Sequence, residues 1–135
     1  MSRQTILITG ATSGIGLGLA QRLHAQGHRL ILTGRRQTLL DQAIADHSGM
    51  TGIQTDITDP AAITALAARL AKDHPDLSTL VHNAGIMQAE HLVTRQTPLT
   101  VAESTITTNL LGPIRLTHAL MPQLLAQPGA RIITV

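Results

Sequence analysis

The chain has 135 residues, a length that allows one domain whose core buries about two-thirds of the unfolded surface. The formal net charge is only +2 and no basic run exceeds two residues, so neither a polyanion-binding patch nor a membrane-surface helix is indicated. Phenylalanine, tyrosine and tryptophan are absent, so the core must be aliphatic and no ring can stack on a base, which argues against binding of single-stranded nucleic acid.

Short apolar runs alternate with helical patterns along the chain. We expect strands near residues 4–9, 28–33, 50–55, 78–82 and 131–135. The first helix is expected to start in the glycine-rich turn after the first strand and to end at Gly27. It carries Ile15, Leu19 and Leu23 at i, i+4 spacing, which predicts an apolar stripe.

The second helix is predicted over residues 38–46. The third opens at Asp59, an N-cap residue, with Pro60 at the first helical position, and ends before Pro75. Its expected buried stripe is Ile63, Leu66, Ala67 and Leu70. Residues 86–98 show little periodicity and predict a long loop at the rim of a binding site. A last helix is expected over residues 100–126.

This alternation predicts an α/β fold of the doubly wound type, in which a parallel sheet of strand order 3-2-1-4-5 carries helices on both faces. We expect residues 1–135 to form a single domain. In such sheets ligands bind where the strand order reverses, here between the first and fourth strands. The turns after Thr9 and at Asn83 are then expected to face the same crevice.

A glycine-rich turn follows the first strand, with the sequence Thr9-Gly10-Ala11-Thr12-Ser13-Gly14-Ile15-Gly16. Spaced glycines allow a tight turn and a close approach of the backbone to phosphate, and the helix N-terminus adds free N–H groups and a positive dipole end. The turn is therefore expected to hold a pyrophosphate. An ordinary tight connection between strand and helix is the alternative.

The spacing G-x-x-x-G-x-G after a threonine resembles the short-chain dehydrogenase/reductase family. The resemblance covers the whole chain, because further motifs follow in the family's order: Gly34-Arg35-Arg36, Asp56-Ile57, Asn83-Ala84-Gly85 and Thr108-Asn109-Leu110-Leu111-Gly112. Residues 131–135 resemble the family's fifth strand, after which members continue into a catalytic serine. The resemblance therefore implies the cofactor-binding portion of this fold, incomplete relative to the family.

The family's proton donor is the tyrosine of a Tyr-x-x-x-Lys pair, whereas this sequence has no tyrosine and a single lysine, Lys72, expected on a helix surface. By resemblance one catalytic residue remains, Asn109, whose backbone carbonyl in the family holds a water of the proton relay. Pro113 lacks the N–H that would bond this carbonyl, so local chemistry indicates the same atom. A kink that serves only packing is the alternative.

Arg35 and Arg36 follow the second strand, where an NAD site would place a carboxylate for the ribose 2′-hydroxyl. Guanidinium groups offer forked, charge-assisted donors to a 2′-phosphate, so the pair favours NADP over NAD. The alternative is an exposed arginine pair that simply starts the second helix.

The resemblance assigns two further turns to the cofactor. Asp56 and Ile57 are implied to contact the adenine, although an Asx turn closing the third strand is the competing interpretation. The family's Asn-Asn-Ala-Gly segment matches residues 82–85 with His82 in place of the first asparagine, and we expect this histidine to be structural. The predicted cofactor-binding residues are Gly10, Thr12, Ser13, Gly14, Ile15, Gly16, Arg35, Arg36, Asp56, Ile57, Asn83, Ala84 and Gly85.

Two functions are compatible with these residues. The first is an NADP-dependent oxidoreductase that transfers hydride between the nicotinamide and a small carbonyl or alcohol substrate, with this chain as its cofactor-binding half, inactive alone. The second is a non-catalytic NADP-binding module or remnant. In either case self-association or a partner is expected to cover the open edge of the fifth strand.

Cysteine is absent, which excludes disulfides and thiolate metal sites and fits a cytoplasmic location. No two histidines share a helix face beside a carboxylate, so no metal site is expected. No apolar stretch approaches the length of a membrane span.

Overall fold

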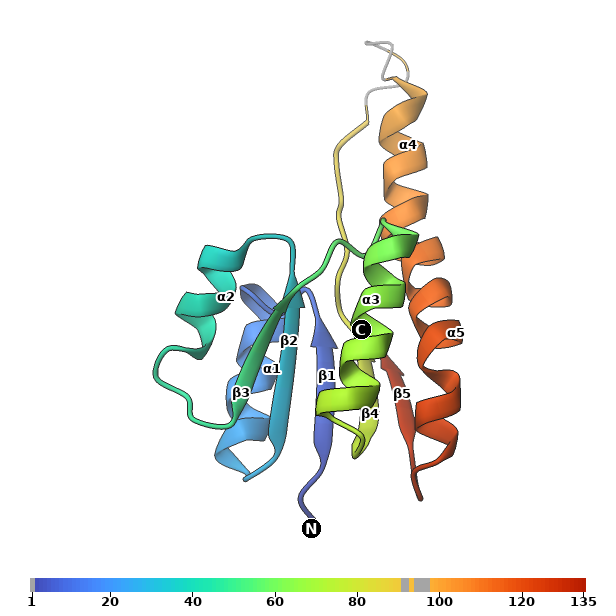
Figure 1. Cartoon of the computed structure of the whole chain (residues 1–135). Helices are drawn as coiled ribbons and strands as arrows, with labels where there is room; N and C mark the ends of the chain where they lie inside the picture. The colour runs from blue at the N-terminus through green and yellow to red at the C-terminus, as the bar shows by residue number, and fades with distance from the viewer. Residues whose placement is uncertain (1, 91–92, 94–97) are drawn as a thin grey trace.

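The computed structural model describes residues 2–90, 93 and 98–135. Its centre is a parallel five-stranded sheet with the order β3-β2-β1-β4-β5 (Figure 1). The predicted doubly wound order is thereby confirmed. The strands are β1 (Thr5–Thr9), β2 (Arg29–Gly34), β3 (Met50–Gln54), β4 (Leu77–His82) and β5 (Arg131–Thr134).

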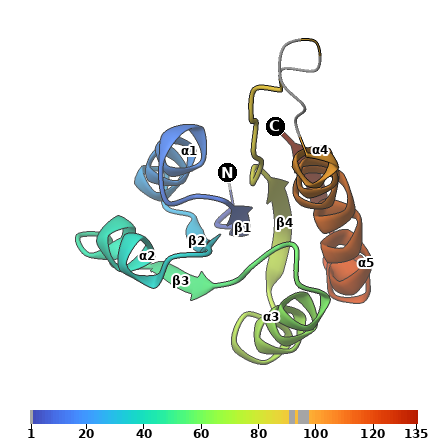
Figure 2. The ribbon, with the colours of Figure 1, turned by 90° about the horizontal axis from the view of Figure 1, so that it is seen from above.

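Helices cover both faces of the sheet, as the view from above shows (Figure 2). α1 (Gly14–Ala25) and α2 (Gln37–Ile44) pack against one face. α3 (Pro60–Asp73) and α5 (Gly112–Leu125) pack against the other. Both faces of the central strands are therefore buried, which is why these strands are continuous apolar runs rather than alternating ones.

The core consists of two aliphatic clusters, one on each face of the sheet. Leu7 and Ile31 belong to the cluster beneath α3 and α5. Ile8 and Leu32, the next residues along the same strands, belong to the cluster beneath α1 and α2. Successive side chains of a strand point to opposite faces, so each strand contributes to both clusters.

The start of α3 follows from its local sequence. The side chain of Asp59 accepts a hydrogen bond from the backbone N–H of Ala61 at 2.9 Å, and Pro60 occupies the first helical position. These contacts are the predicted N-cap arrangement. The predicted stripe is also confirmed, since Ile63, Leu66 and Leu70 are buried and Ala67 packs against them.

The last helical region is divided into three parts. α4 (Leu99–Ile106) extends beyond the sheet, and a π-helical segment, η1 (Thr107–Leu111), joins it to α5 (Figure 1). Pro113 lies in the first turn of α5. Because proline cannot donate the usual helical hydrogen bond, the irregular segment lies directly before it, at the position predicted for a kink.

The structure corrects one part of the predicted core. Ile15 is 71% exposed and does not join Leu19 and Leu23, which pack against the buried cluster. Gly16 and Ala20 are the buried residues of α1, whereas Ile15 lies exposed in its first turn. Of the predicted loop over residues 86–98, residues 91–92 and 94–97 lie outside the described residues, and residues 86–90 have no regular structure.

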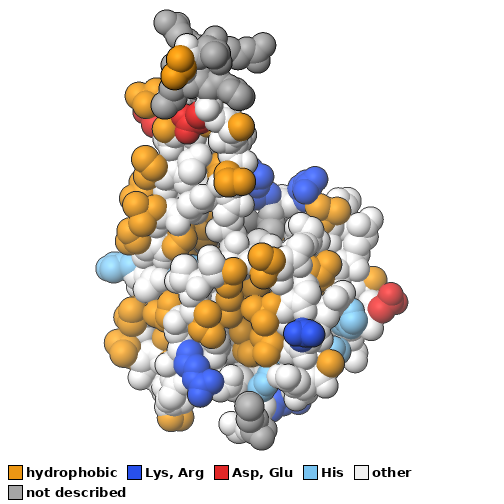
Figure 3. Space-filling model, turned by 180° about the vertical axis from the view of Figure 1, so that it is seen from behind, with side chains coloured by type: hydrophobic (Ala, Val, Ile, Leu, Met, Phe, Trp, Pro, Cys, Tyr) orange, Lys and Arg blue, Asp and Glu red, His pale blue; other side chains and the backbone are white. Residues whose placement is uncertain are grey.

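β5 forms an open edge of the sheet. Ile132, Ile133 and the following Val135 are 44%, 46% and 62% exposed. The rear view of the molecule shows hydrophobic side chains gathered in a patch (Figure 3). Within the described parts of the chain, no helix is both long and apolar enough to cross a membrane.

Candidate cofactor-binding site

A cavity of about 320 Å³ opens at the carboxyl ends of the strands, between the turns that follow β1, β2, β3 and β4. It lies at the predicted switch point, because β1 and β4 are neighbours from which the strand order runs in opposite directions. The lining residues are Thr9, Gly10, Thr12, Ser13, Thr33, Gly34, Arg35, Arg36, Thr55, Asp56, Ile57, Thr58, Asn83, Ala84, Gly85, Ile86 and Thr108.

The lining contains every predicted cofactor-binding residue except Gly14, Ile15 and Gly16, which belong to the first turn of α1. Five further lining threonines are not among the predicted cofactor-binding residues: Thr9, Thr33, Thr55, Thr58 and Thr108. Thr9 and Thr108 stand inside motifs noted in the sequence, whereas Thr33, Thr55 and Thr58 were marked only by nearby motif residues.

Gly10 allows the turns after β1 and β4 to touch. Its φ of 63° lies in the left-handed region, and a Cβ atom at this position would lie 2.7 Å from the Cα of Ala84. Any residue with a side chain would therefore be strained and would separate the two turns. The close approach forms one wall of the cavity from backbone atoms of both turns.

Asn83 holds the glycine-rich turn from the opposite side of the crevice. Its side-chain Nδ2 donates hydrogen bonds to the carbonyl oxygens of Thr9 and Gly10 at 3.1 and 3.0 Å. A Cβ added to Gly16 would contact the same Nδ2 atom. Two backbone carbonyls of the glycine-rich turn are thereby satisfied by the Asn83 side chain, and the N–H of Ala11 in the same turn donates to the carbonyl of Thr33 at 3.2 Å.

Arg35 and Arg36 line the cavity at the end of β2. Arg36 is the N-cap residue of α2, and the first turn of that helix contains no acidic residue. The ion pairs among the described residues, Arg29–Asp76 and Arg69–Asp73, do not involve either arginine. This turn therefore brings two guanidinium groups and no carboxylate to the cavity, and the Asp56 carboxylate on the neighbouring turn is close enough for the charge of Arg35 to act on it.

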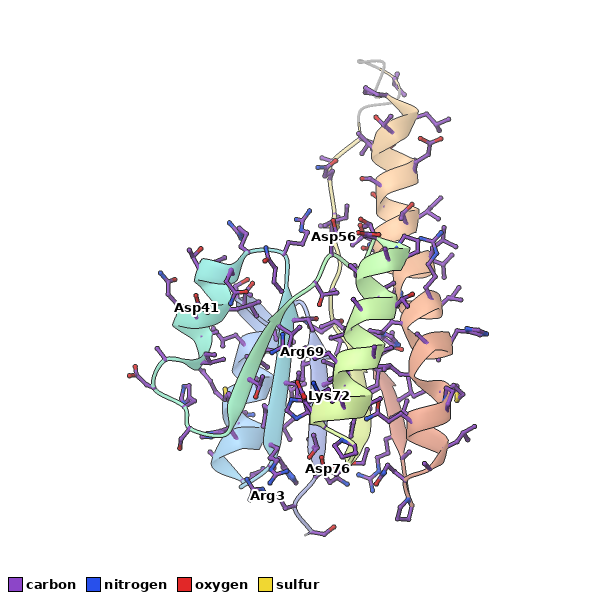
Figure 4. All side chains as sticks on the ribbon, viewed as in Figure 1. Arg3, Asp41, Asp56, Arg69, Lys72 and Asp76 are labelled. Carbon is purple, nitrogen blue, oxygen red and sulfur yellow. The ribbon has the colours of Figure 1, made fainter. Side chains whose placement is uncertain are left out.

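Asp56 lies at the carboxyl end of the sheet, above α3 (Figure 4). One of its oxygens, Oδ1, accepts hydrogen bonds from the N–H of Thr58 at 2.9 Å and from the Thr58 hydroxyl at 2.7 Å. The hydroxyl, the N–H and the charge of Arg35 hold the pKa of Asp56 below its ordinary value, against the opposing effect of burial. The competing Asx turn therefore exists, and it uses one carboxylate oxygen.

Asn109 lies in the π-helical segment and faces the segment after β4. Its Oδ1 accepts from the N–H of Ile86 at 2.8 Å, and its Nδ2 donates to the carbonyl oxygen of Ile86 at 2.7 Å. The side chain is thus bound to the backbone, and the carbonyl remains the group predicted for proton relay. Lys72 lies near the far end of α3, away from Asp56 (Figure 4).

Comparison with known proteins identifies the family. A family model described as short chain dehydrogenase matches residues 4–135. The chain belongs to this family. It is 35% identical over 135 residues to the uncharacterized oxidoreductase DltE of Bacillus subtilis, which covers 100% of this chain and 54% of that protein. It is also 39% identical over 126 residues to serine 3-dehydrogenase of Rhizobium radiobacter. That alignment covers 93% of this chain and 50% of the relative.

A solved structure supports the assignment. Serine dehydrogenase from Escherichia coli aligns with a TM-score of 0.87 and 31% identity, over 97% of this chain and 61% of that one. The short-chain dehydrogenase resemblance predicted from the motifs is thereby confirmed. The chain spans about half the length of the curated relatives named above.

His82 is the position where this short-chain dehydrogenase departs from the family motif. The side chain is 6% exposed, and its Nε2 lies 2.7 Å from the hydroxyl oxygen of Thr117 on α5. Burial lowers the pKa of this imidazole, which favours the neutral form. The histidine joins the end of β4 to α5, in agreement with the structural role expected for it.

Proposed function

We propose that this chain is the NADP-binding part of an oxidoreductase that transfers hydride between the nicotinamide and a carbonyl or alcohol. One observation carries the choice of cofactor: Arg35 and Arg36 line the cavity, and neither their turn nor the first turn of α2 contains a carboxylate. A 2′-phosphate matches guanidinium donors, whereas a ribose 2′-hydroxyl is usually held by an acidic acceptor.

The residues of the cavity fit a dinucleotide. The glycine-rich turn from Gly10 and the N-terminus of α1 would hold the pyrophosphate, since no acidic residue opposes the dipole of that helix. The free carboxylate oxygen of Asp56 would accept from the adenine amino group, and the turn from Asn83 to Gly85 would border a ribose. When bound, the dinucleotide supplies or accepts the hydride.

Substrate chemistry is proposed from the relatives. Two of the similar proteins are named for serine, whose side chain is an alcohol. Serine with NADP is therefore the first substrate pair to assay. The 135 residues contain no tyrosine, so we expect them to bind the cofactor without turning a substrate over, with Asn109 contributing a carbonyl to the relay only where a proton donor is also present.

The cofactor proposal is tested by titrating the chain with NADPH and NADH. We expect NADPH to bind at least about tenfold more tightly, because charge-assisted hydrogen bonds to the phosphate are worth roughly 1.5–3 kcal/mol. Replacing Arg35 or Arg36 by alanine should weaken the binding of NADPH and leave the binding of NADH nearly unchanged. The control is Arg69→Ala, which removes an arginine of α3 paired with Asp73. Equal affinity for both dinucleotides would overturn the choice of NADP.

A non-catalytic NADP-binding module is the second candidate, favoured by the absence of tyrosine. The two candidates differ in a longer or complemented form of the protein: the first predicts that this form transfers hydride between the nicotinamide and serine or a simple carbonyl, which NADPH absorbance follows, and the second predicts cofactor binding without hydride transfer. Hydride transfer by the 135-residue chain would contradict the expectation that it is inactive alone.

We also propose that the exposed edge at β5 is covered by a second copy or a partner. Light scattering across a concentration series tests self-association. Replacing Ile133 by glutamate, which places a charge on the edge strand, should reduce it.

A further inference from the structure

Gln54, the last residue of β3, contacts the turn that carries the two arginines. Its side-chain Nε2 donates a hydrogen bond to the backbone carbonyl oxygen of Arg35 at 2.9 Å. Gln54 and Arg35 are 19 residues apart in the chain and meet because β2 and β3 are neighbours, with Gly34 opposite Gln54 in the register. The contact is therefore a product of the sheet.

The hydrogen bond completes a pattern in the turn. The carbonyl of Gly34 accepts from the N–H of Thr55 at 2.9 Å, and the carbonyl of Arg36 accepts from the N–H of Leu40 at 3.2 Å. Together with the bond from Gln54, three successive carbonyl groups are thus engaged by protein donors. Carbonyl oxygens carry partial negative charge, so their engagement elsewhere favours an anion beside the turn.

The turn is also held from the side of the glycine-rich loop. A Cβ added to Gly34 would lie 2.6 Å from the Cγ2 of Thr12, so the two turns are in contact. Of the three bonds to the carbonyls, only that to Arg35 comes from a side chain. Loss of this bond would remove the side-chain donor that holds the Arg35 carbonyl in its present direction.

We propose that Gln54 is a positioning residue that sets the preference for a 2′-phosphate by holding the Arg35 carbonyl away from it. This inference rests on the proposed binding of NADP. The reason for selectivity is electrostatic: a carbonyl turned toward the ribose repels a phosphate but can accept a hydrogen bond from a 2′-hydroxyl. A purely structural role for Gln54 would instead change the binding of both cofactors equally.

The test compares 2′,5′-ADP with 5′-AMP, which differ only in the 2′-phosphate. Gln54→Met keeps the length of the side chain and removes the donor, and Gln42→Met makes the same change on the exposed surface of α2. We expect Gln54→Met to weaken the binding of 2′,5′-ADP by about three- to tenfold, the range for one hydrogen bond. The binding of 5′-AMP should weaken by less than about twofold. Gln42→Met should leave both unchanged.

Gln54 is exposed, so the variant should remain folded, which circular dichroism and thermal unfolding check. Gln54→Glu provides a second variant, since it cannot donate and adds a negative charge, and should weaken 2′,5′-ADP further. An equal loss for both ligands, or an unchanged preference, would overturn the role of Gln54. Absence of any preference in the unmodified chain would instead overturn the proposed binding of NADP.

Discussion

Asn83 donates two hydrogen bonds to Thr9 across the crevice of the sheet. The hydroxyl oxygen of Thr9 accepts from the backbone N–H of Asn83 at 3.1 Å, and the Asn83 side chain donates to the Thr9 carbonyl at 3.1 Å. The same hydroxyl oxygen accepts from the N–H of Ala84 at 3.0 Å. The two turns that border the cavity are therefore connected without a ligand.

The Thr9 hydroxyl is expected to stabilise the fold measurably. Thr9 is 2% exposed, so Thr9→Val would leave two backbone N–H groups without their acceptor, at a cost of about 1–3 kcal/mol each when fully desolvated. Thr9→Ser keeps the hydroxyl and loses one methyl group, which costs roughly 1 kcal/mol. Urea unfolding measures the loss of stability in both variants. Equal destabilisation by the two substitutions would show that the hydroxyl contributes little.

Gly10 should tolerate no side chain. Gly10→Ala places a Cβ at a φ of 63° and 2.7 Å from a backbone atom of Ala84. The left-handed conformation alone costs roughly 1–2 kcal/mol, and the overlap with backbone adds to it. We therefore expect a loss of more than about 2 kcal/mol in the free energy of unfolding, together with weaker NADPH binding.

The control for the Gly10 substitution is Gly18, another glycine of the same strand-to-helix segment. Gly18 is exposed within α1, and a Cβ added there meets no atom within 4 Å. Gly18→Ala should stabilise the protein by about 0.5–1 kcal/mol, because alanine is the better helix former. A Gly10→Ala variant as stable as Gly18→Ala would contradict the geometry of the turn.

His82 should make stability depend on pH in mildly acidic solution. Burial lowers its pKa below the ordinary value of 6.5, so the unfolded chain binds a proton at a pH where the folded protein does not. The stability contribution is fully present above 6.5 and is lost as the pH falls toward the folded pKa.

The measurement compares unfolding of the natural chain and His82→Asn, the residue in the family motif, across this pH range. The difference in the free energy of unfolding between the two proteins should shift in favour of the asparagine variant as the pH falls. A difference that stays constant would exclude a contribution from His82.

Asp76 should make the stability of the fold depend on pH in a more acidic range than His82 does. Its Oδ2 accepts from the Thr5 hydroxyl at 2.7 Å and from Arg29 at 3.3 Å, and these contacts lower its pKa below 3.8. Stability from this group is present above 3.8 and is lost as the pH falls through the folded pKa.

We expect Asp76→Asn to cost less than about 1 kcal/mol at neutral pH, because the ion pair is half exposed, and the cost to vanish once the pH has fallen below the folded pKa of Asp76. Asp76 lies at the end of the sheet opposite to Asp56 (Figure 4), so NADPH binding should be unchanged. A cost that persists in acid would assign the effect to the hydrogen bond with Thr5 rather than to charge.

Much of the fold was predictable because its signals are local. The N-cap at Asp59 and the proline after it depend on neighbours within one helical turn, and α3 starts where they predict. The π-helical segment lies directly before Pro113 for the same kind of reason. The strand order also followed, since alternating strands and helices allow few right-handed arrangements.

The family, the sheet order and most of the residues around the cavity follow from motifs, spacing and composition within short segments, and all of these can be read from the chain. The exposure of Ile15, the bonds between the Asn109 side chain and Ile86, and the contact of Gln54 with the Arg35 carbonyl could be found only in the folded protein. Burial and hydrogen bonding between distant residues depend on which elements become neighbours in space, and the pattern within one segment does not contain that information.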